Sequence, residues 1–154
     1  MTASPAAHVE MLIRKPAAEV FAAFVEPQLL TRFWLSHASA PLVAGTRVRW
    51  DFMVEGASAE LDVKAIEPAK RILIEWVGGG TVEWTFTEAA GKETVVTVID
   101  RGFSGSLDEQ IAAAVESTQG FTIVLCDLKV LLERGTSPGL VKDKAALLMA
   151  SGGK

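Results

Sequence analysis

The sequence predicts an α+β fold in which a curved antiparallel sheet of about six strands wraps around a long C-terminal helix. Three observations predict this fold. Apolar residues alternate with period two near the N-terminus, the same period returns five times between residues 45 and 100, and helical spacing follows from residue 106 to residue 135. The predicted order is therefore strand, two short helices, five strands and one long helix. A sheet with one apolar face needs such a covering layer.

The first strand is predicted over residues 8–14, where Val9, Met11 and Ile13 alternate with polar side chains. Pro16 suits the first turn of a helix, because a helix leaves that N–H without a partner in any case. The spacing of apolar residues predicts a helix over residues 17–25. Pro27 ends this helix and opens a second short helix that extends to Trp34.

Five further strands follow in a meander, because the breaks between them are short and turn-like. Gly78-Gly79-Gly80, for example, joins two strands and is predicted to form a hairpin turn. The apolar residues of each strand share one parity and are expected to face the long helix. They are Val48, Trp50, Phe52 and Val54; Leu61, Val63 and Ala65; Ile72, Ile74 and Trp76; Val82, Trp84 and Phe86; and Val96 and Val98.

The long helix is predicted to begin after Ser106, which can cap it, and to end at Gly135. Gly120 lies in its middle, where a glycine costs about 1 kcal/mol relative to alanine, so a bend or a close contact is expected there. Residues 1–135 are predicted to form a single domain, and residues 136–154 a tail that could form a short amphipathic helix. The apolar face of the long helix comprises Ile111, Val115, Thr118, Phe121, Leu125, Leu128 and Leu132.

Composition narrows the class of protein. The 154 residues are 49% hydrophobic and 22% charged, typical of one globular domain, and the net charge of -4 argues against a nucleic-acid partner. The single cysteine, Cys126, cannot form an internal disulfide and is expected to be a small buried residue. No signal sequence and no apolar run of roughly 20 residues is visible, so we expect a cytoplasmic protein without a membrane span. The two histidines are too scattered for a metal site, and no cofactor is predicted.

The aromatic residues are the most informative candidates for a binding site. There are four Trp and seven Phe but no Tyr. Trp50, Trp76 and Trp84 share the inward parity, so they either line a pocket for a small molecule or simply fill the core; both interpretations remain open. The candidate ligand-binding residues are Trp34, Trp50, Phe52, Trp76, Trp84, Phe86, Asp100, Phe121 and Leu125.

No catalytic residue is predicted. Two titratable residues, Asp100 and His37, are weak candidates for catalysis. Alternation places Asp100 on the inward face, where an ionised carboxylate is costly unless it is paired. One interpretation is that Asp100 pairs with Arg101 or Arg32 at the rim, or caps a turn. The other is that its pKa is raised, so that it could act as a general acid or base or accept a hydrogen bond from a ligand. His37 is expected in a loop after Trp34, where it could serve as a base, but the sequence supplies no partner for a triad.

Five segments resemble the SRPBCC superfamily of START-like, helix-grip domains, and within it the bacterial branch named for the activator of the heat-shock chaperone ATPase. They are IRKPAAEVFAAFVEPQLLTRFW (13–34), GTRVRWDF (45–52), ILIEW (72–76), VVTVIDRGF (95–103) and QGFTIVLCDLKVLLERG (119–135). Phe121 stands where the family usually has a tryptophan after the glycine. The resemblance implies a helix-grip fold with a hollow between the sheet and the long helix.

The resemblance leaves three functions open, because fold alone does not determine function. The first is binding of an apolar or amphipathic small molecule between the aromatic residues and the long helix. The second is an interaction protein that stimulates a chaperone. The third is an enzyme of the cyclase or hydratase type that uses Asp100, with or without His37; on balance we expect no enzyme. A homodimer, which is common in the family, also remains open.

Overall fold

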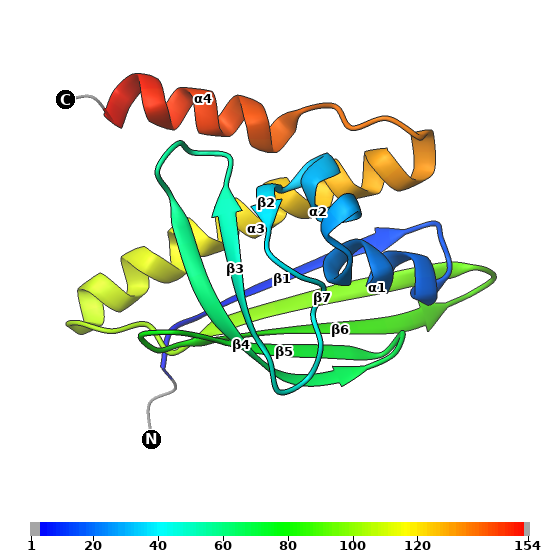
Figure 1. The fold of residues 1–154 in the computed structure, drawn as a ribbon, viewed down its shortest axis with the longest axis horizontal. Coiled ribbons are helices and arrows are strands. Elements are labelled where there is room, and N and C mark those ends of the chain that lie inside the picture. The colour runs from blue at the N-terminus through cyan, green and yellow to red at the C-terminus, as the bar shows by residue number, and fades with distance from the viewer. Residues whose placement is uncertain (1–3, 153–154) are drawn as a thin grey trace.

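The computed structural model describes residues 4–152 and folds them into one seven-stranded antiparallel sheet with four helices, which confirms the predicted α+β class (Figure 1). The strand order is β1-β7-β6-β5-β4-β3-β2, so the N-terminal strand pairs with the last strand. The elements are β1 (Ala6–Ile13), α1 (Ala17–Val25), α2 (Pro27–Phe33), β2 (Leu35–Ala38), β3 (Arg47–Phe52), β4 (Ser58–Glu67), β5 (Arg71–Trp76), β6 (Thr81–Ala89), β7 (Glu93–Arg101), α3 (Leu107–Arg134) and α4 (Leu140–Gly152).

The sheet has one strand more than the sequence predicted, because β2 is short and irregular. Leu35 pairs with Phe52 and His37 pairs with Asp51, so the register shifts between Leu35 and His37. This irregularity removes the alternation that identifies a strand, since the two central residues of β2 are both exposed. His37 therefore lies in an edge strand, and the prediction that it lies in a loop is wrong.

The meander strands show the predicted parity except in β4. Val63 pairs with Ile74 and Ala65 pairs with Leu73, so Lys64 is an extra residue in a bulge. The bulge reverses the parity of the following residues. Ile66, rather than the predicted Ala65, therefore takes the inward position opposite Ile72 and packs against the core.

Helix α3 crosses the concave face of the sheet (Figure 1). It begins at the predicted cap, where Ser106 and Glu109 form a capping box, and it ends at Gly135 in the left-handed conformation. Phe121, Leu125 and Leu128 are buried as predicted, whereas Ile111 and Val115 are exposed. A helix of 28 residues is about 42 Å long, so its first turns extend past the shorter strands.

Helix α3 is also the one helix in the described residues that is long and apolar enough to cross a membrane, with a mean hydropathy of 1.3 over its best window. The core helix of a domain passes the same test. Phe121, Leu125 and Leu128 belong to the hydrophobic core of this fold, so the apolar face of α3 is accounted for by packing against the sheet.

Candidate ligand cavity

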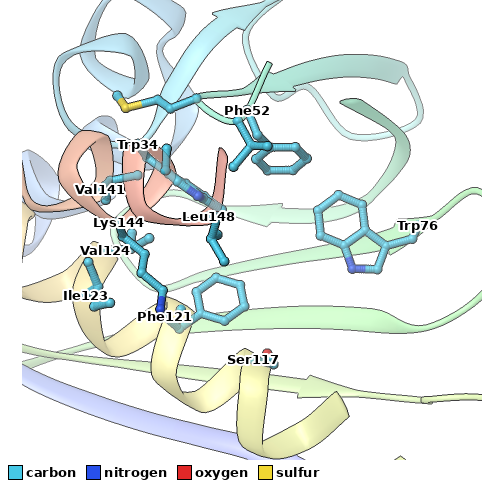
Figure 2. A pocket seen from close by; sticks show the side chains of 14 residues that line it. Trp34, Phe52, Trp76, Ser117, Phe121, Ile123, Val124, Val141, Lys144 and Leu148 are labelled. Carbon is cyan, nitrogen blue, oxygen red and sulfur yellow. The ribbon is translucent and has the colours of Figure 1, made fainter. Parts of the chain in front are cut away.

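A cavity of about 270 Å³ lies where α3, α4 and the β3–β4 hairpin meet (Figure 2). Its walls are almost entirely apolar, which is the usual composition of a small-molecule site. Only Ser117 and Lys144 bring polar side chains to it. The lining residues are Trp34, Phe52, Met53, Val54, Trp76, Ser117, Gly120, Phe121, Ile123, Val124, Val141, Lys144, Ala145 and Leu148.

Four of the predicted ligand-binding residues line this cavity: Trp34, Phe52, Trp76 and Phe121. They come from the end of α2, from β3, from β5 and from α3, so distant parts of the chain meet at one site. The ring of Trp34 lies 5.7 Å from that of Phe121 and 6.3 Å from that of Phe52, measured between centroids. These spacings are typical of aromatic pairs in contact, so Trp34, Phe52 and Phe121 form one continuous wall. Trp76 lies apart from these three rings (Figure 2).

The other predicted aromatic residues lie behind that wall rather than in it. Trp50 and Trp84 are fully buried, and neither they nor Phe86 and Leu125 line the cavity. Trp50 contacts both Trp34 and Trp76 edge to face, with centroids 5.0 and 6.0 Å apart. The Nε1 atoms of Trp50 and Trp84 are buried without a hydrogen-bond partner in the structure. These two indoles thus support the cavity wall from the core side.

Asp100 lies beside the cavity without lining it. It belongs to a neighbouring depression, and Trp76 lines both this depression and the cavity. Ser117 Oγ donates a hydrogen bond of 2.6 Å to Asp100 Oδ2. Within residues 4–152, neither Arg101 nor Arg32 forms an ion pair with Asp100. Burial consequently raises the pKa of Asp100 above its ordinary value, although the Ser117 hydrogen bond opposes that shift.

His37 is not brought together with Asp100 or with the cavity. Its side chain is 67% exposed, and its Nδ1 lies 3.4 Å from Asp51 Oδ2 on the paired strand. Cys126 is half-buried with a free thiol. In the part of the chain that the structure describes, no three His, Cys, Asp or Glu side chains are grouped so that they could hold a metal ion.

Helix α4, which lies in the predicted tail, supplies four cavity residues that were not predicted to bind a ligand: Val141, Lys144, Ala145 and Leu148. They recur at three- and four-residue spacing, which places them on one face of the helix. That spacing was the available signal, but it could not show where the helix docks. Figure 1 shows α4 lying above α3 and over the tip of the β3–β4 hairpin. The backbone N–H of Glu55 in this hairpin lies 3.5 Å from Met149 Sδ.

A buried carboxylate fixes the start of α4. Asp127 of α3 is fully buried, and it accepts hydrogen bonds from Ser137 Oγ (2.7 Å) and from the backbone N–H of Leu140 (2.8 Å). The second of these satisfies an N–H group that has no partner within its own helix. Asp127 thereby joins α3 to the helix that covers the cavity.

Comparison with known proteins places this fold in a family. The model of the Activator of Hsp90 ATPase homolog 1-like protein family matches residues 14–133, which excludes α4. A protein of Staphylococcus saprophyticus, SSP2350, is 25% identical with a TM-score of 0.75, and the match covers 86% of this chain and 94% of the other. DynU16, a protein of the dynemicin biosynthetic locus, is 26% identical with a TM-score of 0.76, covering 88% of this chain and 49% of the other.

A third solved structure, the Aha1 dimer of Colwellia psychrerythraea, is 17% identical with a TM-score of 0.72, and the match covers 83% of this chain and 96% of the other. No curated protein matches the chain. The family match spans well over half of the 154 residues and agrees with the observed sheet and long helix. The chain therefore belongs to the family of Activator of Hsp90 ATPase homolog 1-like proteins.

Proposed function

We propose that this protein binds a small apolar or amphipathic molecule in the cavity beneath α4. The observation that carries the proposal is an apolar cavity of about 270 Å³, open to the surface, with aromatic walls between the hydrophobic core and α4. Apolar walls that are left facing water in a concave site are unfavourable, because they lack the burial and the dispersion contacts that an apolar group would provide. An apolar guest would restore those contacts.

The size of the cavity limits the ligand. At roughly 30 Å³ for each non-hydrogen atom, the volume of a water molecule in the liquid, the cavity of about 270 Å³ holds about nine such atoms. This volume is just below the usual range for small-molecule sites, which begins at roughly 300 Å³. An eight-carbon chain or a single substituted ring is the expected scale, with any polar group at the mouth.

Isothermal titration of the full chain with octanol tests this proposal, and tryptophan emission provides a second readout because Trp34 and Trp76 line the cavity. Gly120 offers a matched pair of variants, since an added Cβ there would meet nothing within 4 Å. We expect Gly120→Leu to weaken octanol binding about tenfold or more by filling the mouth. Gly120→Ala, which adds one methyl group, should bind as the wild type does.

Equal octanol affinity in the wild type and in Gly120→Leu would contradict binding at this cavity. If octanol, octanoate and octylamine all failed to bind the wild type, the proposed function would be wrong. Circular dichroism spectra that match the wild type would show that both variants fold.

The family description favours stimulation of a chaperone ATPase as a second candidate. Addition of this protein to Hsp90 should then raise the rate of ATP hydrolysis, and an unchanged rate would remove this candidate. The dimer of the Colwellia relative also makes a homodimer an expectation for this chain, which sedimentation equilibrium would test. Enzymatic use of Asp100 has less support, because its carboxylate does not line the cavity and His37 lies elsewhere.

A further inference from the structure

We propose that the natural ligand is an amphipathic anion whose carboxylate pairs with Lys144 at the mouth of the cavity. This inference rests on the proposed function and adds the chemical class of the ligand. It concerns α4, which lies outside the residues that the family match covers.

Lys144 is the one charged side chain among the residues that line the cavity. The other polar side chain, Ser117, already donates its hydroxyl hydrogen to Asp100. Ser117 can therefore only accept a hydrogen bond from a ligand, whereas Lys144 brings three donors and a full positive charge. The polar group best matched to this lining is an anion.

The ammonium group of Lys144 also has no carboxylate partner in the described residues. Lys64 pairs with Glu75 and Lys129 pairs with Glu133, at 3.5 and 2.8 Å. No acidic oxygen of residues 4–152 lies within 4.0 Å of Lys144 Nζ. Lys144 is nevertheless half-buried. A charge that is partly removed from water and lacks a partner gains from an anion that arrives with a ligand.

The position of Lys144 fits the head group of a ligand whose tail occupies the cavity. Figure 2 shows its side chain running from α4 toward α3 and ending close to Phe121. A second depression shares Ser117, Gly120, Lys144 and Leu148 with the cavity. Lys144 thus lies at the passage between the cavity and the surface, with its aliphatic stem against apolar groups.

Other charges near this passage are few. Glu116 lines the second depression together with Lys144, so its carboxylate could compete for the ammonium group. Asp143 precedes Lys144 in α4. Asp100 accepts a hydrogen bond from Ser117 and lines neither of these two depressions. Replacing Glu116 by Gln should therefore strengthen the binding of an anion. The change removes a carboxylate that competes for Lys144 and that repels the negatively charged ligand.

The test compares octanoate, octanol and octylamine, which share an eight-carbon chain, by isothermal titration of the full chain at neutral pH. We expect octanoate to bind the wild type about tenfold or more tightly than the other two, as a charge-assisted hydrogen bond implies. Lys144→Met should lose this preference while octanol binds as before, and Lys144→Arg should retain it. Lys142→Met is the matched control, since Lys142 is exposed on the same helix and lines none of these depressions.

The outcomes separate the two proposals. Equal affinities for octanoate and octanol, or an octanoate preference that survives in Lys144→Met, would overturn the anion proposal and leave binding in the cavity intact. Failure of all three probes would overturn binding itself. If Lys144→Met did not fold, Glu116→Gln would still decide the matter, because an unchanged octanoate affinity in that variant would count against Lys144 as the anion partner.

Discussion

At the scale of single residues, Gly120 borders open space, whereas the sequence predicted a bend or a close contact there. A glycine inside a helix suggested a bend or a close contact, yet nothing lies within 4 Å of where its Cβ would be. Its neighbours in space are instead the cavity and its mouth. Gly120 therefore leaves the passage wide at the expense of helix stability.

Replacing Gly120 by Ala should stabilise the fold by about 1 kcal/mol, because alanine has the higher helix propensity and meets no obstacle here. Urea unfolding measures the change. Gly135→Ala is the opposite control, since Gly135 has a φ of +86° at the helix end and an L side chain is strained there. A loss of stability in Gly120→Ala would show that the position is more crowded than the structure indicates.

Asp100 gives a second prediction at this scale. Burial raises the pKa of its carboxyl above 3.8, so the native state holds the proton more tightly than the unfolded chain does. The resulting stabilisation is fully present below pH 3.8 and is lost as the pH rises through the native pKa. Asn cannot titrate, so Asp100→Asn should gain stability relative to the wild type between pH 3.8 and neutrality.

Urea unfolding at a series of pH values tests this relative gain. Ser117→Ala, which removes the hydrogen bond that opposes the pKa shift, should show a steeper loss of stability with rising pH than the wild type. A difference between Asp100→Asn and the wild type that does not vary with pH would contradict the raised pKa.

At the scale of elements, local patterns predicted most of the architecture. Strict alternation fixed the inward residues of β3, β5, β6 and β7, and the capping residue Ser106 fixed the start of α3. Irregular pairing explains what was missed. The register shift in β2 and the bulge at Lys64 depend on partner strands far away in sequence. No local period reports such pairing.

The candidate site was predictable only in part for a similar reason. Parity shows that Trp50, Trp76 and Trp84 face inward, but not that two of them are sealed in the core while one meets open space. That difference depends on α4, whose docking requires the buried Asp127 to meet Ser137 and Leu140. A carboxylate on an apolar helix face was a signal for such an anchor.

Two adjacent alanines of α4 test whether this helix closes the cavity. Ala145 is buried and lines the cavity, whereas Ala146 is exposed. Ala145→Glu would place an unpaired carboxylate against apolar walls, which costs several kcal/mol unless α4 moves away. We therefore expect Ala145→Glu to weaken octanol binding at least tenfold and to increase fluorescence of a hydrophobic dye. Ala146→Glu should change neither octanol binding nor dye fluorescence. Similar losses of octanol affinity in both variants would argue against closure of the cavity by α4.

At the scale of the whole molecule, two parts differ in how they are held. The sheet, α1, α2 and α3 share one hydrophobic core, whereas α4 reaches that core mainly through Val141 and has Ala145 as its buried residue. Leu147, Leu148 and Met149 of α4 remain 67%, 43% and 43% exposed. Segments with few buried apolar contacts open at lower free energy than the rest of a domain. We therefore predict that a ligand enters by movement of α4 while the sheet stays intact.

Amide hydrogen exchange checks this division. In the free protein, the amides of α4 should exchange faster than those of α3 around Leu125, because opening of α4 costs less than global unfolding. If that opening empties the cavity, a probe at 100 times its dissociation constant should slow exchange in α4 by about a hundredfold, which is the linkage expected for a ligand that binds only the closed state. Exposed amides of the turn between β6 and β7, at Gly91 and Lys92, line none of the depressions, so they serve as the internal control and should not change. Equal exchange in α3 and α4, or protection by octanoate that spares α4, would show that ligands enter by another route.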